Sequence, residues 1–285
     1  NEELINGGIQ RIFRNIINLR SYHIVFPLIY NENSLIDDDW KNVMKLIDSH
    51  AHLMDEMYEN DLEAVIRRWE ENNIECVVNI GYSEKTSYEA IKMSEKYDWM
   101  YATIGLHPDE CNQENVDMEF IYQFAKNQKV VAIGEIGLDY HYESTNRENQ
   151  KRHFIKQIEI ANELNLPVVI HSREATQDTL EILKRYSLKG VIHSFSGSKE
   201  IAREYIKLGY KLGINGVVTF KNAHIIDVIK ELGLSHFVLE TDSPYLTPAP
   251  YRGQKNYPGN ISIIVNFLKE QLALTEEDTF ELRIL

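Results

Sequence analysis

Histidine side chains with a metal-binding spacing occur early in this sequence, where a short apolar run, 46–49, leads into His50-Ala51-His52. Successive side chains of a strand point to opposite faces, so His50 and His52 would share one face and could reach a single metal ion. Taken by itself, a His-x-His pair is better interpreted as a solvated strand end. A metal site therefore requires further ligands that the fold brings to the same point.

The elements that would position such ligands alternate regularly from residue 46 onward. Short apolar, β-branched runs are separated by stretches of helical periodicity, which is typical of repeated βα units and a parallel sheet. The predicted strands are 46–49, 76–80, 100–105, 130–134, 167–170, 190–193, 211–214 and 237–240. The predicted helices are 60–72, 85–97, 118–127, 147–164, 175–186, 199–208, 223–232 and 260–272. Asn146 and Ser198 stand at N-cap positions, and Gly190 and Gly209 where helices are expected to stop.

The number and character of these strands favour an α/β fold of the (β/α)8 TIM-barrel type. The runs are nearly continuously apolar, as expected when both faces of a strand are buried, and eight strands close a barrel. An open dinucleotide-binding sheet is disfavoured because no Gly-x-Gly-x-x-Gly turn follows the first strand. In a barrel of this type the chemistry lies at the carboxyl ends of the strands.

Metal-binding side chains recur at those strand ends. The residues found there are His50, His52, His107, Glu135, His171, His193 and Asp242. A single buried histidine is more often a core residue than a ligand, but this many side chains at strand ends predict a metal centre. His23, His153, His224 and His236 are expected in surface or capping positions, and His141 is ambiguous.

Four histidines and two carboxylates exceed the needs of one tetrahedral ion, so we expect two divalent ions. Glu135, with two oxygens, is the expected bridge. His50, His52 and Asp242 are assigned mainly to one ion, and His171 and His193 to the other. An imidazole-rich site favours zinc, manganese or iron over magnesium, and the identity of the metal stays open among these four.

Composition sets limits on function and organisation. The formal net charge of −14 over 285 residues argues against a basic nucleic-acid-wrapping surface, but not against a nuclease whose positive charge comes from metal ions. Cys76 and Cys111 are expected to be reduced, and neither a membrane-spanning run nor a secretory signal is recognised, so we expect a soluble cytoplasmic protein without a membrane partner. Residues 1–43 read as an N-terminal extension of unknown role, and 44–285 as the barrel domain.

From residue 46 to about residue 274 the chain resembles the TatD family of metal-dependent deoxyribonucleases, a branch of the amidohydrolase-like metallohydrolases. The resemblance rests on seven motifs in order: Asp48-Ser49-His50-Ala51-His52, Ile104-Gly105-Leu106-His107-Pro108, Gly134-Glu135-Ile136-Gly137-Leu138-Asp139-Tyr140, Ile170-His171-Ser172-Arg173, His193-Ser194-Phe195-Ser196-Gly197, Thr219-Phe220-Lys221-Asn222-Ala223 and Leu239-Glu240-Thr241-Asp242-Ser243-Pro244-Tyr245-Leu246. It implies a TIM-type barrel and hydrolysis of DNA phosphodiesters. It also implies that His50, His52, Glu135, His171, His193 and Asp242 are metal ligands, with Asp242 acting on the water as well.

Three departures from the family pattern stand out. Residues 1–43 have no counterpart in the family. The family often has Arg-Gly-x-x-Asn-Glu-Pro after the eighth strand, whereas Asn256 is followed here by Tyr257-Pro258, a change that could alter substrate contacts. The end of the chain differs from the family's usual last helix, which we expect to be shortened or altered.

The resulting expectation is a deoxyribonuclease that acts exonucleolytically on single-stranded or frayed DNA ends through a metal-activated water. Asp242 would accept the proton, with Glu135 and His107 also in the catalytic group. The expected phosphate contacts are Arg173, Lys221 and Arg252, although solvated loop cations would look the same for the last two. Tyr140, Tyr142, Phe195 and Tyr245 would either stack unpaired bases or cover the core, and Asp139 would either orient a ligand or cap a turn.

Two other classes of function stay open. The same ligands would serve a metallohydrolase acting on a small ester, amide, lactone or phosphoester, or on misacylated tRNA. A non-catalytic binding protein would be expected to have lost ligands, whereas every ligand position is filled. Cleavage polarity and oligomeric state are not predicted.

Overall fold

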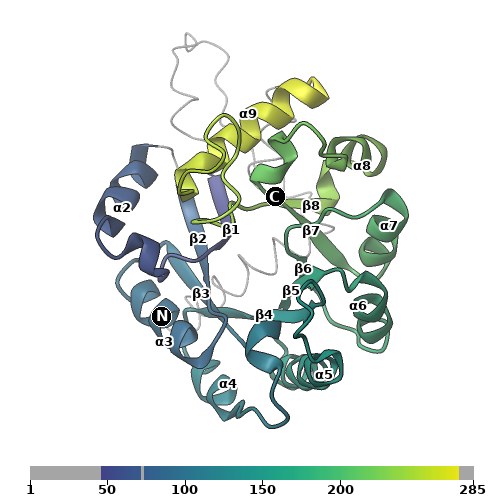
Figure 1. Cartoon of the computed structure of the whole chain (residues 1–285). Coiled ribbons are helices and arrows are strands. Elements are labelled where there is room, and N and C mark those ends of the chain that lie inside the picture. Colours follow the sequence, from purple (N-terminus) through teal and green to yellow (C-terminus); the bar gives the residue numbers. More distant parts are fainter. Residues whose placement is uncertain (1–45, 72–73, 276–285) are drawn as a thin grey trace, which may run out of the picture.

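The computed structural model describes residues 46–71 and 74–275. In this part of the chain, eight parallel strands follow one another around a barrel in the order β1 to β8, and helices surround it (Figure 1). The strands are β1 (Leu46–Ala51), β2 (Ile74–Ile80), β3 (Met100–Ile104), β4 (Val130–Asp139), β5 (Val168–Arg173), β6 (Gly190–Ile192), β7 (Tyr210–Ile214) and β8 (Phe237–Leu239). The predicted (β/α)8 fold is confirmed.

The helices fall where the apolar periodicity places them, with ends that differ by a few residues. They are α2 (Leu62–Glu71), α3 (Glu84–Ser94), α4 (Glu119–Phe124), α5 (Arg147–Leu164), α6 (Thr176–Leu183), α7 (Lys199–Lys207), α8 (Ile225–Leu232) and α9 (Ile261–Leu272). Short 3-10 turns complete the connections: η2 (Glu56–Tyr58), η3 (Pro108–Cys111), η4 (Gly216–Thr219), η5 (Leu234–His236) and η6 (Pro258–Asn260). Within the described residues, no helix combines the length and apolarity that crossing a bilayer demands.

Local capping sets several helix ends as predicted. The Asn146 side chain accepts a hydrogen bond from Asn149 N at the start of α5, and Ser198 does the same for Ile201 N at the start of α7. Gly209 follows α7 with φ +94°, a conformation that glycine adopts without strain. The prediction for Gly190 is wrong. The helix before it ends at Leu183, and Gly190 opens β6, where a Cβ would collide with the Val168 carbonyl oxygen.

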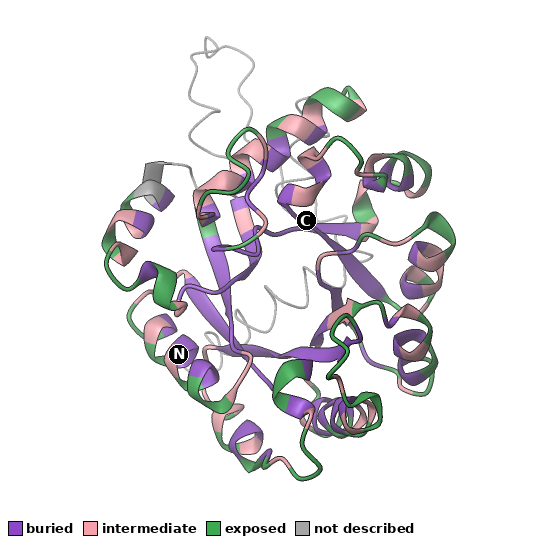
Figure 2. Ribbon diagram, in the orientation of Figure 1, coloured by how far each residue is buried: buried purple, intermediate pink, exposed green. Residues whose placement is uncertain are grey.

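Apolar side chains fill both faces of the sheet (Figure 2). One buried cluster joins strand residues such as Ile133 to helix residues such as Phe154, and it forms the layer between barrel and helices. A second cluster, which includes Cys76, Val78 and Val169, consists of strand residues and fills the inside of the barrel. Burial on both faces explains the continuously apolar strands. Cys76 is buried, as predicted, and Cys111 is buried as well.

The barrel closes between β8 and β1 through residues that follow β8. Asp242 N donates to His50 O over 2.8 Å, and His52 N donates to Ser243 O over 2.7 Å. In the same seam, both the backbone N and the hydroxyl of Thr241 donate to the buried Asp48 carboxyl. Burial, the largest effect, raises the pKa of Asp48 to about 7 although the hydrogen bonds from Thr241 lower it. The seam therefore brings the His-x-His stretch directly against Asp242.

The proposed extension, residues 1–43, and the last residues of the chain, 276–285, lie outside the described residues.

Candidate metal centre

Two irregularities in strand pairing coincide with predicted ligands. The register of β1 against β2 shifts between Asp48 and Ala51, next to His50, and that of β4 against β5 shifts between Ile133 and Ile136, on either side of Glu135. Such irregularities re-aim side chains and are common beside active sites. They also account for one wrong boundary: β4 was predicted to end before Glu135 but continues to Asp139, so Glu135 lies within the strand.

The first group of donor atoms joins the end of β1 to Glu135 within β4 and to Asp242, which follows β8. His50 Nε2 lies 3.2 Å from His52 Nε2 and 3.5 Å from both Glu135 Oε2 and Asp242 Oδ1. His52 Nε2 lies 3.5 Å from Asp242 Oδ1 and 3.9 Å from Glu135 Oε2. Donors bound tetrahedrally to one zinc ion at the usual bond length are separated by roughly 3.3 Å. His50, His52 and Glu135 form a set whose ligand atoms lie within 4.8 Å of one another, so this group fits a metal ion, with Asp242 close to both histidines. The predicted common direction of the two histidines is confirmed.

The second group faces the other oxygen of Glu135. His171 Nδ1 lies 2.8 Å from Glu135 Oε1, and His193 Nε2 lies 4.0 Å from the same oxygen. Glu135 thus directs one carboxylate oxygen to each side, as a bridging ligand would. His107 joins Glu135 and His171 in a set whose ligand atoms lie within 4.8 Å of one another.

His193 is shared between the two groups more than the sequence suggested. Its Nε2 is 3.6 Å from Asp242 Oδ1, nearer than to Glu135, and it forms a metal-type set with His50 and Asp242. Its ring stacks on that of His50, with centroids 3.6 Å apart. His193 thus lies close to donor atoms of both groups.

Burial and neighbouring charges shift the pKa values of the predicted metal ligands. Burial lowers the pKa of His193, but Glu240, Asp242 and Glu135 raise it to about 10. Burial likewise lowers the pKa of His171, while hydrogen bonds with Asp139 and Glu135 raise it to about 9. Burial raises the pKa of Glu135, yet the neighbouring histidines bring it well below its ordinary value. Without metal, His193 and His171 therefore favour their protonated, cationic forms, whereas burial and the neighbouring His193 lower the pKa of His50.

Residues behind the histidines fix their rings. His52 Nδ1 lies 3.0 Å from Ile80 O, which accepts hydrogen bonds only, so Nδ1 holds the proton and Nε2 keeps its lone pair for the centre. Asp139 Oδ2 lies 3.1 Å from His171 Nε2, which is the orienting position considered for Asp139.

Glu240 provides the corresponding support for His193, a role the sequence reasoning did not assign. Its fully buried Oε1 lies 3.0 Å from His193 Nδ1 and accepts hydrogen bonds from Ser194 N and Asn215 Nδ2. The available signal was a second carboxylate beside Asp242 at the same strand end. Neither its partner His193 nor the contact between Asp48 and Thr241 can be identified from the sequence, because both depend on how the strands lie in the folded barrel.

The predicted phosphate-binding residues occupy different positions. Arg173 ends β5, and its guanidinium lies 3.9 Å from Asp139 Oδ2, close to His171. Lys221 is exposed in the turn after η4. Arg252 is exposed after β8, with its guanidinium 4.4 Å from the centre of the Phe220 ring. Arg173 is therefore brought to the metal group, whereas Lys221 and Arg252 lie on loops at the rim of the barrel mouth.

Other histidines lie apart from the metal group. His141 Nδ1 pairs with Glu174 Oε1 at 2.6 Å on the surface. The surface or capping position predicted for His153 is wrong, because this residue lies on the buried face of α5 with Gln150 and Gln157, where its Nε2 is 2.9 Å from Gln113 O. The family departure at Tyr257 is also remote from the ligands. Its ring lies 6.0 Å from that of Tyr58, and its hydroxyl lies 3.5 Å from Asp61.

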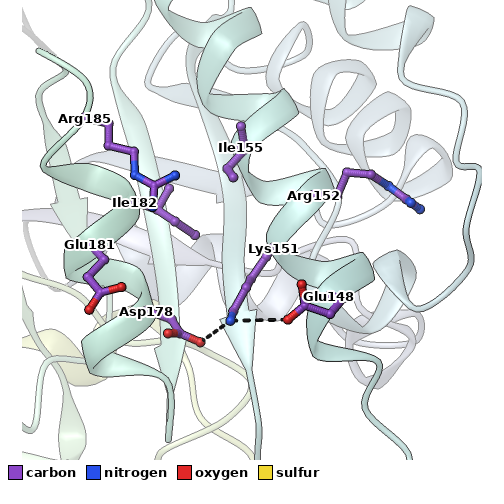
Figure 3. Close-up of a pocket in the computed structure, with 8 residues that line it drawn as sticks. All are labelled: Glu148, Lys151, Arg152, Ile155, Asp178, Glu181, Ile182 and Arg185. Carbon is purple, nitrogen blue, oxygen red and sulfur yellow. Dashed lines mark hydrogen bonds and ion pairs between the residues drawn. The ribbon is translucent and has the colours of Figure 1, made fainter.

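A different cluster of charged residues lines a surface hollow between α5 and α6 (Figure 3). Lys151 projects into it and pairs with Asp178 at 2.8 Å and with Glu148 at 3.5 Å. Arg152, Glu181 and Arg185 also line the hollow. Acid and base occur here in equal numbers, and the candidate metal-binding sets found among the described residues do not include these side chains.

Comparison with known proteins gives a consistent result. Residues 47–282 match the family model described as TatD related DNase. An uncharacterized metal-dependent hydrolase of Bacillus subtilis, YabD, is 43% identical over 241 residues, which cover 83% of this chain and 93% of that protein. A metal-dependent hydrolase of Escherichia coli K12, YcfH, is 32% identical over 251 residues, 83% of this chain and 94% of that protein. The crystal structure of YjjV, a TatD homolog of E. coli K12, superposes with a TM-score of 0.80 at 29% identity, covering 85% of this chain and 96% of the other.

Proposed function

The chain belongs to the TatD-related DNase family of metal-dependent hydrolases, and we propose that it hydrolyses phosphodiester bonds of DNA, starting from single-stranded or frayed ends. The observation that carries the proposal is the arrangement of Glu135, whose two oxygens face two separate groups of histidines. Two divalent ions held in this way suit a phosphodiester, because phosphoryl transfer requires charge stabilisation at both the attacking and the leaving oxygen.

The proposed ligand sets follow the donor distances. His50, His52 and Asp242 would hold one ion and His171 the other, with Glu135 bridging them and His193 reaching both sides. Bound zinc, manganese, iron or magnesium would lower the pKa of a bound water and would stabilise negative charge on the phosphoryl oxygens. Imidazole donors favour the first three of these metals.

Asp242 is the residue we propose to accept the proton. Burial raises its pKa, but His193, His50 and His52 more than reverse that effect and hold the carboxyl ionised. Its Oδ1 faces the histidines of the first group. A carboxylate in this position accepts a proton without moving.

His107 and Arg173 are proposed to contact the phosphate. The His107 ring lies 4.5 Å from that of His171, and Arg173 ends the same strand that carries His171. The Arg173 guanidinium can donate two parallel hydrogen bonds to a phosphate. Lys221 and Arg252 would act farther out, on the flanking nucleotides.

One observation favours a second candidate, hydrolysis of a small ester or amide, or of misacylated tRNA. The formal charge of −14 repels a long polyanion, and the rim includes carboxylates such as Glu174 beside the cations. The metal group itself would serve either reaction.

Metal analysis combined with a substrate panel separates the two candidates. The purified protein is assayed for bound metals, stripped, and reloaded with one metal at a time before incubation with labelled single-stranded DNA, duplex DNA, and small esters and amides. We expect metal-dependent release of nucleotides, faster from single strands than from blunt duplexes. Turnover of small esters without cleavage of DNA under any metal would contradict the proposal.

A further inference from the structure

Four aromatic residues follow the strands near the metal group, and burial divides them into two pairs. Tyr140 and Phe195 are each 8% exposed and belong to the core. Tyr142 and Tyr245 are 51% and 47% exposed. An aromatic ring that is half exposed beside a buried polar site contributes little to the core but offers a face to a ligand.

Tyr245 is fixed on one side of the mouth. Its hydroxyl donates to Asp55 Oδ2 over 2.6 Å, and its ring centre lies 6.0 Å from that of His52. Tyr82, which follows β2, lies 5.5 Å from the same imidazole. A ring held at both its hydroxyl and its edge loses little conformational entropy when a ligand stacks on it.

Tyr142 occupies a second position, next to the other histidine group. Its ring centre lies 5.0 Å from that of His141 and 5.7 Å from the guanidinium of Arg173. Arg173 contacts Asp139, which in turn holds His171. This position therefore combines an exposed ring with a cation that can bind phosphate.

The two tyrosines come from opposite parts of the barrel. Tyr245 follows β8, which closes against β1, while Tyr142 follows β4, which pairs with β5 (Figure 1). In a ring of eight strands these two pairs face each other across the mouth. The two histidine groups meet at Glu135, His193 and Asp242, with Tyr245 near His52 of one group and Tyr142 near Arg173 beside the other.

We propose that Tyr245 and Tyr142 each stack one unpaired base, on opposite sides of the phosphodiester to be cleaved, with Arg173 binding the phosphate next to Tyr142. This proposal rests on the proposed function and refines it, because it assigns a base-binding position to each side of the metal group. A base inside a duplex is already stacked and paired, so two such positions select single-stranded or frayed DNA.

The experiment compares Tyr245→Ala and Tyr142→Ala with the corresponding Phe variants and with Tyr88→Ala. Tyr88 is 51% exposed on α3, on the outer surface, and controls for loss of an exposed tyrosine. The substrates are short single-stranded oligonucleotides with natural bases, or with one abasic residue at successive positions beside the cleaved bond. KM and kcat are measured, and rapid mixing with oligonucleotides that contain 2-aminopurine reports stacking as fluorescence quenching before cleavage.

Each Ala variant is expected to raise KM roughly fivefold or more with little change in kcat, and to lose the quenching at one position of the oligonucleotide. Tyr142→Phe should keep both the wild-type KM and the quenching, because the ring is retained. Tyr245→Phe should keep the quenching, with a KM between those of the wild type and Tyr245→Ala because it loses the hydroxyl contact with Asp55. Tyr88→Ala should match the wild type. An abasic residue at the matching position should raise the wild-type KM to that of the Ala variant.

Two results would overturn the inference, and they are distinguishable. If the wild type cleaves DNA but the Ala variants keep its KM and its quenching, the stacking positions are wrong while the proposed function stands. If the wild type cleaves no DNA with any metal, the proposed function fails and the inference fails with it.

Discussion

The metal group in the barrel mouth and the charged hollow between α5 and α6 both gather acidic and basic side chains, yet they differ in burial and in the source of positive charge. In the hollow, Lys151 is a permanent cation that pairs with Asp178 and Glu148 at a partly exposed position. In the mouth, Glu135 and Asp242 are buried, and their neighbours are imidazoles. A lysine completes its own ion pair, whereas imidazole nitrogens can exchange protons for a metal.

The difference shows which property distinguishes a reaction site from a surface ion-pair cluster. Burying charged groups is costly unless they are compensated, so a protein keeps a cluster such as the metal group only where a bound cation or retained protons provide compensation. Partly exposed pairs need no such compensation because water screens them.

The largest expected effect comes from the same substitution made in both regions. Glu135→Gln removes the carboxylate that we propose to bridge two metal ions, so bound metal should be lost and hydrolysis should fall by roughly a thousandfold or more. Glu148→Gln, in the outer hollow, should leave metal content and activity unchanged. Metal analysis measures the bound metal, hydrolysis assays measure the activity, and circular dichroism checks that both variants are folded. A fully active Glu135→Gln protein would remove the main distinction between the two regions.

A smaller effect is expected one step behind the ligands. Glu240→Gln keeps the size of the side chain but removes the charge beside His193 Nδ1, so metal affinity should fall by roughly 10- to 100-fold. Competition with a chelator measures the affinity, and Glu181→Gln in the outer hollow is the matched control. Equal affinities in the two variants would show that Glu240 has a packing role only.

In the protein stripped of metal, the free energy of unfolding should depend on pH through the histidines of the metal group and not through the ion pairs of the outer hollow. The folded-state pKa values of His193 and His171, about 10 and about 9, lie above the ordinary value of about 6.5. Their contribution to the free energy of unfolding is therefore complete below about pH 6.5 and is lost as the pH rises through about 9 to 10.

Thermal unfolding between pH 6 and pH 10 measures this loss. Reloading with metal should remove the decline, because a coordinating nitrogen holds no proton. Lys151→Met should leave the shape of the profile unchanged. A flat profile for the stripped protein would show that these histidines do not hold protons in the folded state.

The smallest effect is expected in the outer hollow itself. Lys151→Met removes two ion pairs whose members are all partly exposed, so the free energy of unfolding should fall by about 0–1 kcal/mol. Denaturant unfolding measures the change. A loss of several kcal/mol would mean that the hollow is a preorganised site rather than a surface ion-pair cluster.

The fold class and the set of candidate ligands follow from the order of the amino acids alone. Continuous apolar runs, helical periodicity and caps such as Asn146 are local properties, and a closed barrel gathers strand ends wherever they lie in the chain. His50, Glu135 and Asp242 could therefore be placed together from their positions after apolar runs. Exposure, however, could not be read from the pattern, which is why Tyr140 and Tyr142 looked alike.

How these residues face one another depends on contacts between distant segments of the folded chain. The two directions of the Glu135 carboxylate, the sharing of His193 and the support from Glu240 depend on register shifts in β1 and β4 and on the seam between β8 and β1. These features arise from contacts between segments almost two hundred residues apart, such as Asp48 with Thr241. Local sequence does not encode them. A shift of one residue in strand register turns every side chain of the strand to the other face, yet the apolar run in the sequence is the same in both registers.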